Sequence, residues 1–143
     1  MNKIVQAARN IGVCERWTRK LTGEETDEQL FDLYRKEGQF QEFCDKHRFP
    51  PVELLRASRE TAERYGILVD KTGEIKDPDF LALYGDCCLT VVSTVYTRLI
   101  VNGNSRVRIR AEGMARVDVD LYDRARIVGR EGTGKIVVCD HVK

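Results

Sequence analysis

The chain has 143 residues, of which 24 are Lys or Arg and 23 are Asp or Glu, so its formal net charge is +1. A chain of this length forms one domain or two small abutting units and buries about two-thirds of its unfolded surface. Because the charges nearly balance, the composition alone does not indicate nucleic-acid binding.

Two further features concern the cellular compartment. The sequence contains no run of 18 apolar residues, and residues 1–9 lack the continuous apolar core of a signal peptide. Five cysteines, including the adjacent Cys87 and Cys88, fit reduced thiols better than a disulfide framework. We therefore expect a cytoplasmic protein that does not contact a membrane.

The first 66 residues carry apolar side chains at the spacing of short helices that end at glycine or proline. Thr26 followed by Gln29 forms a capping box, and Pro51 suits the first turn of a longer helix. The predicted helices cover residues 4–11, 13–21, 26–38, 40–44 and 51–65. These helices predict a helical subdomain over residues 1–66.

The next segment predicts two short strands. Residues 67–69 and 80–83 are apolar and branched, and residues 70–73 between them have the composition of a turn. Pro78 restricts the second strand to an edge or to its own beginning.

From residue 87 to residue 138 one pattern occurs six times: a small residue, a basic residue, a branched apolar residue, any residue and a second apolar residue. The copies begin at residues 87, 97, 105, 115, 125 and 134. Between residues 105 and 111, Val107, Ile109 and Ala111 alternate with arginines, which is the pattern of a half-buried strand.

Short strands at this spacing predict an all-β unit over residues 67–143, either a short β-solenoid with two strands per coil or an antiparallel meander or sandwich. The regular aliphatic rows favour the solenoid. Its coils would align Leu99, Val117 and Ile136 in one row and Val107 with Ile127 in another. The predicted class is α+β, with the N-terminal helices as a cap on one apolar end of the repeat unit.

Few residues suggest chemistry. Cys44 with His47 and Cys139 with His141 could together supply four zinc ligands, but each pair is a weak signal. The sequence contains no nucleotide-binding or hydrolase motif and only two histidines. We therefore predict a protein with no catalytic residues, no metal and no cofactor.

A nucleic-acid-binding accessory protein is the alternative function. Residues 40–65 have the outline of a helix-turn-helix, in which Arg48, Arg56 and Arg59 would contact the nucleic acid. Glutamates share the same helix with these arginines, and acidic residues oppose phosphate binding. Nucleic acid is thus a possible partner that the sequence does not favour.

Four stretches carry a resemblance to other proteins. They are AARNIGVC at 7–14, FPPVELLR at 49–56, YGILVD at 65–70 and the Ala-Arg-Val repeats. Together they resemble a group of uncharacterised proteins from gut Bacteroidales and their mobile elements and prophages. This resemblance implies the same architecture and a mobile-element or phage setting, and it brings no activity and no catalytic residues.

The end of the repeat predicts self-association. Residues 139–143 contain too little chain to cover the aliphatic end of a last coil, and such a patch approaches the limit that a monomer tolerates. We expect a non-catalytic structural or interaction protein that forms a homodimer or small closed oligomer. Its interface would involve Ile127, Ile136 and Val138.

Overall fold

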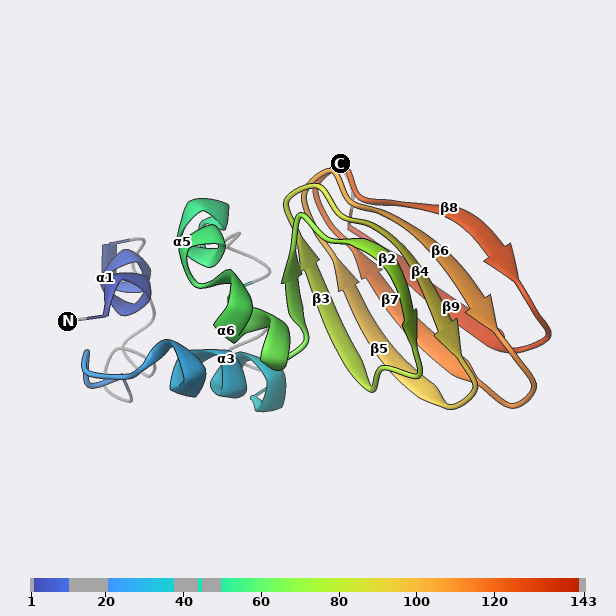
Figure 1. Ribbon diagram of the computed structural model, residues 1–143, viewed down its shortest axis with the longest axis horizontal. Coiled ribbons are helices and arrows are strands. Elements are labelled where there is room, and N and C mark those ends of the chain that lie inside the picture. The colour runs from blue at the N-terminus through green and yellow to red at the C-terminus, as the bar shows by residue number, and fades with distance from the viewer. Residues whose placement is uncertain (1, 11–20, 38–43, 45–49, 142–143) are drawn as a thin grey trace. The chain divides into compact units, whose positions relative to one another are not determined.

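The computed structural model describes residues 2–10, 21–37, 44 and 50–141. The chain divides into two compact units, Met1–Tyr65 and Gly66–Lys143. The first unit is helical and the second consists of strands (Figure 1). The predicted class, helices followed by a β-repeat unit, is confirmed.

The helical unit contains four described helices: α1 (Lys3–Asn10), α3 (Asp27–Lys36), α5 (Val52–Ala57) and α6 (Arg59–Arg64). The predicted capping box begins α3, because the backbone N–H of Thr26 donates to Gln29 Oε1 at 2.9 Å and the N–H of Gln29 donates to Thr26 Oγ1 at 3.2 Å. The predicted helices at 13–21 and 40–44 lie outside the described residues, apart from Leu21 and the buried, helical Cys44.

The predicted helix over residues 51–65 is interrupted at Ser58, which separates α5 from α6. The Ser58 N–H donates to the Leu55 carbonyl at 3.1 Å, a bond one residue shorter than the α-helical pattern. The Ser58 hydroxyl donates to the Asp27 carboxylate on α3. This contact ties the break between α5 and α6 to the start of α3.

The second unit is a β-solenoid. Its strands are β1 (Ile67–Val69), β2 (Thr72–Lys76), β3 (Phe80–Tyr84), β4 (Cys88–Ser93), β5 (Tyr96–Val101), β6 (Arg106–Ala111), β7 (Arg116–Leu121), β8 (Arg126–Glu131) and β9 (Lys135–Asp140). Odd-numbered strands form one sheet, in the order β1-β3-β5-β7-β9, and even-numbered strands form the other, β2-β4-β6-β8. Every neighbouring pair is parallel.

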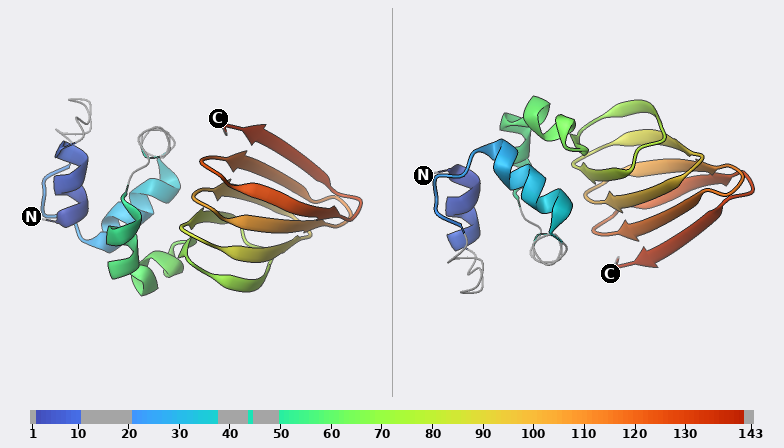
Figure 2. Two further views of the ribbon diagram at one scale, coloured as in Figure 1. Left: turned by 90° about the horizontal axis from the view of Figure 1, so that it is seen from above. Right: turned by 90° about the horizontal axis from the view of Figure 1, so that it is seen from below.

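Each coil therefore contributes one strand to each sheet, and successive coils stack on one another (Figures 1 and 2). Parallel pairing throughout is incompatible with a meander or an antiparallel sandwich, so the solenoid prediction is confirmed. The strands β4 to β9 begin within one residue of the small residue of each repeat, which marks the start of the strand.

The predicted rows are correct in part. Val107 pairs with Ile127, and Val117 pairs with Ile136. Leu99, however, pairs with Val119, and Thr97 takes the place beside Val117. The prediction was wrong by two residues because a buried threonine fills a core position.

Two hydrogen bonds explain why Thr97 fits there. Its hydroxyl donates to the Pro78 carbonyl at 2.7 Å and lies 2.9 Å from Ser93 Oγ, so the Thr97 hydroxyl is not left unpaired in the core.

The segment between β1 and β3 also differs from the prediction. Its residues 72–76 form β2, which pairs with β4 in the opposite sheet. Of residues 70–73, predicted as a turn, only 70 and 71 lead from one sheet to the other, and 72 and 73 belong to β2. Ile75 is the one residue of β2 that packs against the apolar core, so the sequence lacks the alternation that indicates a strand.

The core between the two sheets is aliphatic, and its corners are occupied by small side chains. Cys87, Ser105, Ala115 and Ala125 are all buried at the junction of a turn and a strand. A Cβ atom on Gly134, the equivalent residue of the last repeat, would lie 2.8 Å from the Cβ of Ala111. The small residue of the repeat is therefore a packing requirement of the corner.

The central coils should be the most sensitive to loss of side-chain volume. Ile109 is fully buried, and we expect Ile109→Ala to lower the free energy of unfolding by about 2–5 kcal/mol, because it removes apolar contacts and leaves a cavity. The exposed Val128→Ala should change it by less than about 0.5 kcal/mol. Urea unfolding followed by circular dichroism would measure both, and equal effects would contradict the assigned core.

Candidate functional site

The predicted site residues lie in different parts of the chain. Arg56 is exposed on α5 and Arg59 is exposed on α6, whereas Arg48 lies outside the described residues. Ile127 lies on β8, and Ile136 and Val138 lie on β9. The structure thus brings together the three predicted interface residues and places the two described arginines on separate short helices.

The terminal coil is less buried than the coils before it. Val107, Val117 and Val119 have exposed fractions of 0%, 0% and 2%. Their partners in the terminal coil, Ile127, Ile136 and Val138, are only partly buried and pack against the core cluster from one side. On the same two strands Val128 is 46% exposed and Val137 is 36% exposed. The terminal coil therefore presents apolar side chains to the surroundings.

The two strands of this coil have different outer edges. In β8 the register shifts after Ile127, so Val128 is an extra residue and forms a bulge. The exposed Arg130 then pairs with the buried Ile109, so a charged residue takes the register position that an aliphatic residue holds in the preceding coil. Bulges and charged side chains on an edge strand are features with which proteins block the addition of a further strand.

Strand β9 lacks these features. It pairs with β7 without a shift over all six residues from Lys135 to Asp140. Among the described residues, no strand pairs with the outer edge of β9, which lies at the limit of its sheet (dark red in Figure 2). A regular, unblocked edge can accept a strand from another chain.

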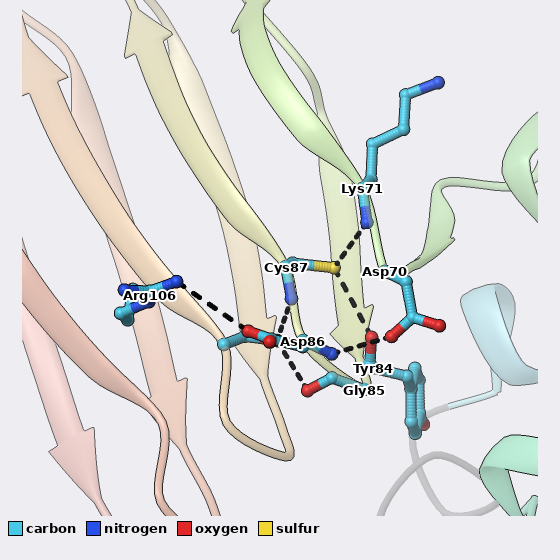
Figure 3. Close-up of polar contacts among 8 residues, drawn as sticks. Asp70, Lys71, Tyr84, Gly85, Asp86, Cys87 and Arg106 are labelled. Atoms are coloured by element: carbon cyan, nitrogen blue, oxygen red, sulfur yellow. Dashed lines mark hydrogen bonds and ion pairs between the residues drawn. The ribbon is translucent and has the colours of Figure 1, made fainter.

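A buried cysteine organises a corner in the first coils (Figure 3). The backbone N–H of Cys87 donates to Ser105 Oγ at 3.1 Å, and its thiol donates to the Tyr84 carbonyl at 3.4 Å. The thiol also accepts from the Lys71 N–H at 3.4 Å. Burial raises the pKa of the Cys87 thiol, which therefore stays neutral and serves as a corner donor.

Three arginines gather at the turns between the sheets. A recess of about 310 Å³ is lined by Asp86, Asn104, Arg106, Arg124 and Arg126. Arg106 and Arg126 are register partners, so the basic position of the repeat places them side by side. Arg106 Nη2 lies 3.9 Å from Asp86 Oδ1 (Figure 3). The sequence shows each arginine, but the recess follows only from the stacking of the coils.

A second group of side chains gathers on the outer face of β7 and β9. Asp120 and Cys139 are register partners, and His141 directly follows β9. His141 Nε2 lies 3.0 Å from Asp120 Oδ1. The possible ligand atoms of the three residues all lie within 4.8 Å of one another. The sequence suggested Cys139 and His141 as a pair but not Asp120, which lies about one coil earlier.

Comparisons with known proteins do not add a relationship. No protein-family model, no curated protein and no solved structure matches this chain. Among the described residues, no helix is long and apolar enough to cross a membrane. The geometry of the solenoid is therefore the basis for assigning a function.

The cysteines of the β unit should differ in reactivity. Cys88 and Cys139 are exposed, whereas Cys87 is buried with a raised thiol pKa, so a small alkylating reagent at mildly alkaline pH should label the first two and spare Cys87. Peptide mass spectrometry after timed labelling would measure this. Urea-unfolded protein, in which every thiol is accessible, is the control, and labelling of native Cys87 as fast as Cys88 would contradict the assigned corner.

Proposed function

We propose that the protein is a non-catalytic structural or interaction protein that self-associates through its terminal coil. The observation that carries this proposal is the regular outer edge of β9, which adjoins partly buried apolar side chains. The occupant we propose for this edge is β9 of a second copy, paired antiparallel. On the resemblance described above, the proposal includes a phage or mobile-element origin, which the genes flanking the coding sequence would test.

The backbone of β9 has hydrogen-bonding groups available for such pairing. Lys135 N–H donates to the Ala115 carbonyl at 2.9 Å, and His141 N–H donates to the Leu121 carbonyl at 2.8 Å. Because donors alternate along a parallel strand, the odd-numbered residues of β9 donate toward β7. The N–H groups of Ile136 and Val138 then point to the outer edge, where a second strand would satisfy them.

The sequence of β9 suits pairing with itself. An antiparallel pair centred on Val137 places Val137 opposite its own copy and Ile136 opposite Val138. Lys135 then lies opposite Cys139, so no two like charges face each other directly. Apolar residues meet apolar residues on both faces of this pair. A two-fold arrangement of this kind uses the same edge on both copies and therefore closes at a dimer.

The edge can be tested with one position and two substitutions. Val138→Pro removes the N–H that points outward, while the N–H groups that face β7 remain. Val138→Ala removes much of the same side chain but keeps the outward N–H, so it is the matched control. We expect the native protein and Val138→Ala to be dimers at tens of micromolar and Val138→Pro to be a monomer.

Light scattering coupled to size-exclusion chromatography would measure the masses, and circular dichroism would confirm that both variants fold. A monomeric native protein, or a Val138→Pro variant that remains dimeric, would overturn the proposal.

The alternative function has its own test. We expect no binding of duplex DNA at low salt. The helix that would contact the DNA is divided at Ser58 into α5 and α6. Both halves carry glutamates beside their arginines, and acidic residues oppose phosphate binding. A fluorescence anisotropy titration at two salt concentrations would measure this. Tight binding with a steep salt dependence, lost in an Arg56→Ala, Arg59→Ala double variant, would instead favour the nucleic-acid-binding function.

A further inference from the structure

We propose that Asp120, Cys139 and His141 form a binding site for a transition metal ion, and that zinc is the ion that fits best. This site goes beyond the self-association proposed above and does not depend on it. It uses the outward-facing side chains of β7 and β9, whereas the proposed dimer uses the outer backbone edge of β9.

The topology explains why the three residues meet. Asp120 and Cys139 are direct partners in the parallel pair of β7 and β9, so their side chains leave the same face of the sheet. Cys139 and His141 are two residues apart along the chain, which again places both on that face. The ladder continues past β9, because the His141 N–H donates to the Leu121 carbonyl at 2.8 Å. The backbone thus aims all three side chains toward one point.

The imidazole is oriented before any ion binds. Its ring stacks on Tyr122, with the centroids 4.4 Å apart and the planes 5° from parallel. Its Nε2 lies 3.0 Å from Asp120 Oδ1. A metal ion that takes the place of the proton between this nitrogen and this oxygen would be bound by both atoms, with little side-chain movement.

The carboxylate is oriented as well. Arg98 Nη2 lies 2.9 Å from Asp120 Oδ2, while Oδ1 is the oxygen that faces His141. An ion pair on one oxygen fixes the carboxylate plane and leaves the other oxygen for a metal, as outer-shell partners do in many metal sites.

The chemical types of the three ligand atoms indicate which metal ion fits. A thiolate, an imidazole nitrogen and a carboxylate oxygen together suit zinc and related transition metals, whereas magnesium and calcium prefer oxygen ligands alone. Zinc binds these donors at about 2.0–2.3 Å, and ligand atoms already within 4.8 Å of one another can converge to such distances by small rotations. Three protein ligands leave the fourth tetrahedral position for water.

A bound ion would add a further link between two neighbouring strands of the sheet. Asp120 belongs to β7, and the other two ligands belong to β9 and the residue after it. Because the ligands converge only in the folded solenoid, the ion would bind the folded state and raise its stability. Zinc is therefore expected to slow amide hydrogen exchange in β9 more than in β4.

The test uses the full-length chain and two readouts. A zinc titration against a chromophoric chelator gives affinity and stoichiometry, and cobalt gives an absorption band from thiolate-to-cobalt charge transfer. The variants are Cys139→Ser, Asp120→Asn and His141→Phe, of which the last keeps an aromatic ring to stack on Tyr122. Cys88→Ser is the matched control, because it removes an exposed cysteine from an outer strand face away from the site.

We expect one zinc ion per chain and a thiolate–cobalt band that Cys139→Ser abolishes. Each of the three ligand variants should weaken zinc binding by more than the roughly 10–100-fold that loss of an outer-shell partner costs. Cys88→Ser and the monomeric Val138→Pro should bind zinc as the native protein does, which separates this site from the dimer. Binding no tighter than the chelator's, or binding that survives Cys139→Ser or is lost in Cys88→Ser, would overturn the proposal.

Discussion

The corners of the solenoid are the constraint on which the rest of the β unit depends. Neighbouring strands of a sheet lie about 4.8 Å apart, so a side chain at a corner has another corner directly above and below it. Cys87, Ser105 and Ala125 occupy one such column, and all three are buried. The backbone ladder continues through this column, because the Arg106 N–H donates to the Cys87 carbonyl and the Arg126 N–H donates to the Ser105 carbonyl. A larger side chain at these positions would separate the coils.

Because the coils stack in register, the inward and outward faces of the strands carry different kinds of side chain. Inward positions hold the aliphatic rows, and outward positions hold charged residues that pair across strands, as Arg98 does with Asp120 at 2.9 Å. The terminal coil differs, because its aliphatic side chains are only partly buried. Its two edges differ, because β8 carries a bulge at Val128 and the exposed Arg130 in register with Ile109, whereas β9 is regular. The contrast between these neighbouring strands indicates that one edge is protected and the other is left open.

The sequence predicted those features that depend on local spacing. The small residue and the alternation after it marked the strands from β4 to β9 and favoured a solenoid over a meander. Residues 72–76 have a single core contact, from Ile75, so β2 left almost no periodic signal. The sequence also showed no sign of the break at Ser58, whose hydroxyl bonds to Asp27, a residue distant in sequence.

Strand register was the second feature that the sequence did not predict fully. The row of Leu99 was misplaced because Thr97 is polar but buried, and the side-chain grouping around Asp120 requires that β7 and β9 pair without a shift. A motif search examines neighbours along the chain, whereas the partner of Cys139 lies on the preceding coil of the same sheet. Sequence spacing therefore located single residues of the candidate site but not their grouping.

The bulge at Val128 also bears on how such a chain can change in length during evolution. An insertion of one residue in a central strand would turn the following side chains of that strand to the opposite face or require a bulge, whereas duplication of a complete coil keeps the register of every strand. Arg106 and Arg126 are equivalent points between which such a duplication could occur. The extra residue of β8 lies in the last described strand of its sheet. We therefore expect the interior of the stack to gain or lose whole coils more readily than single residues.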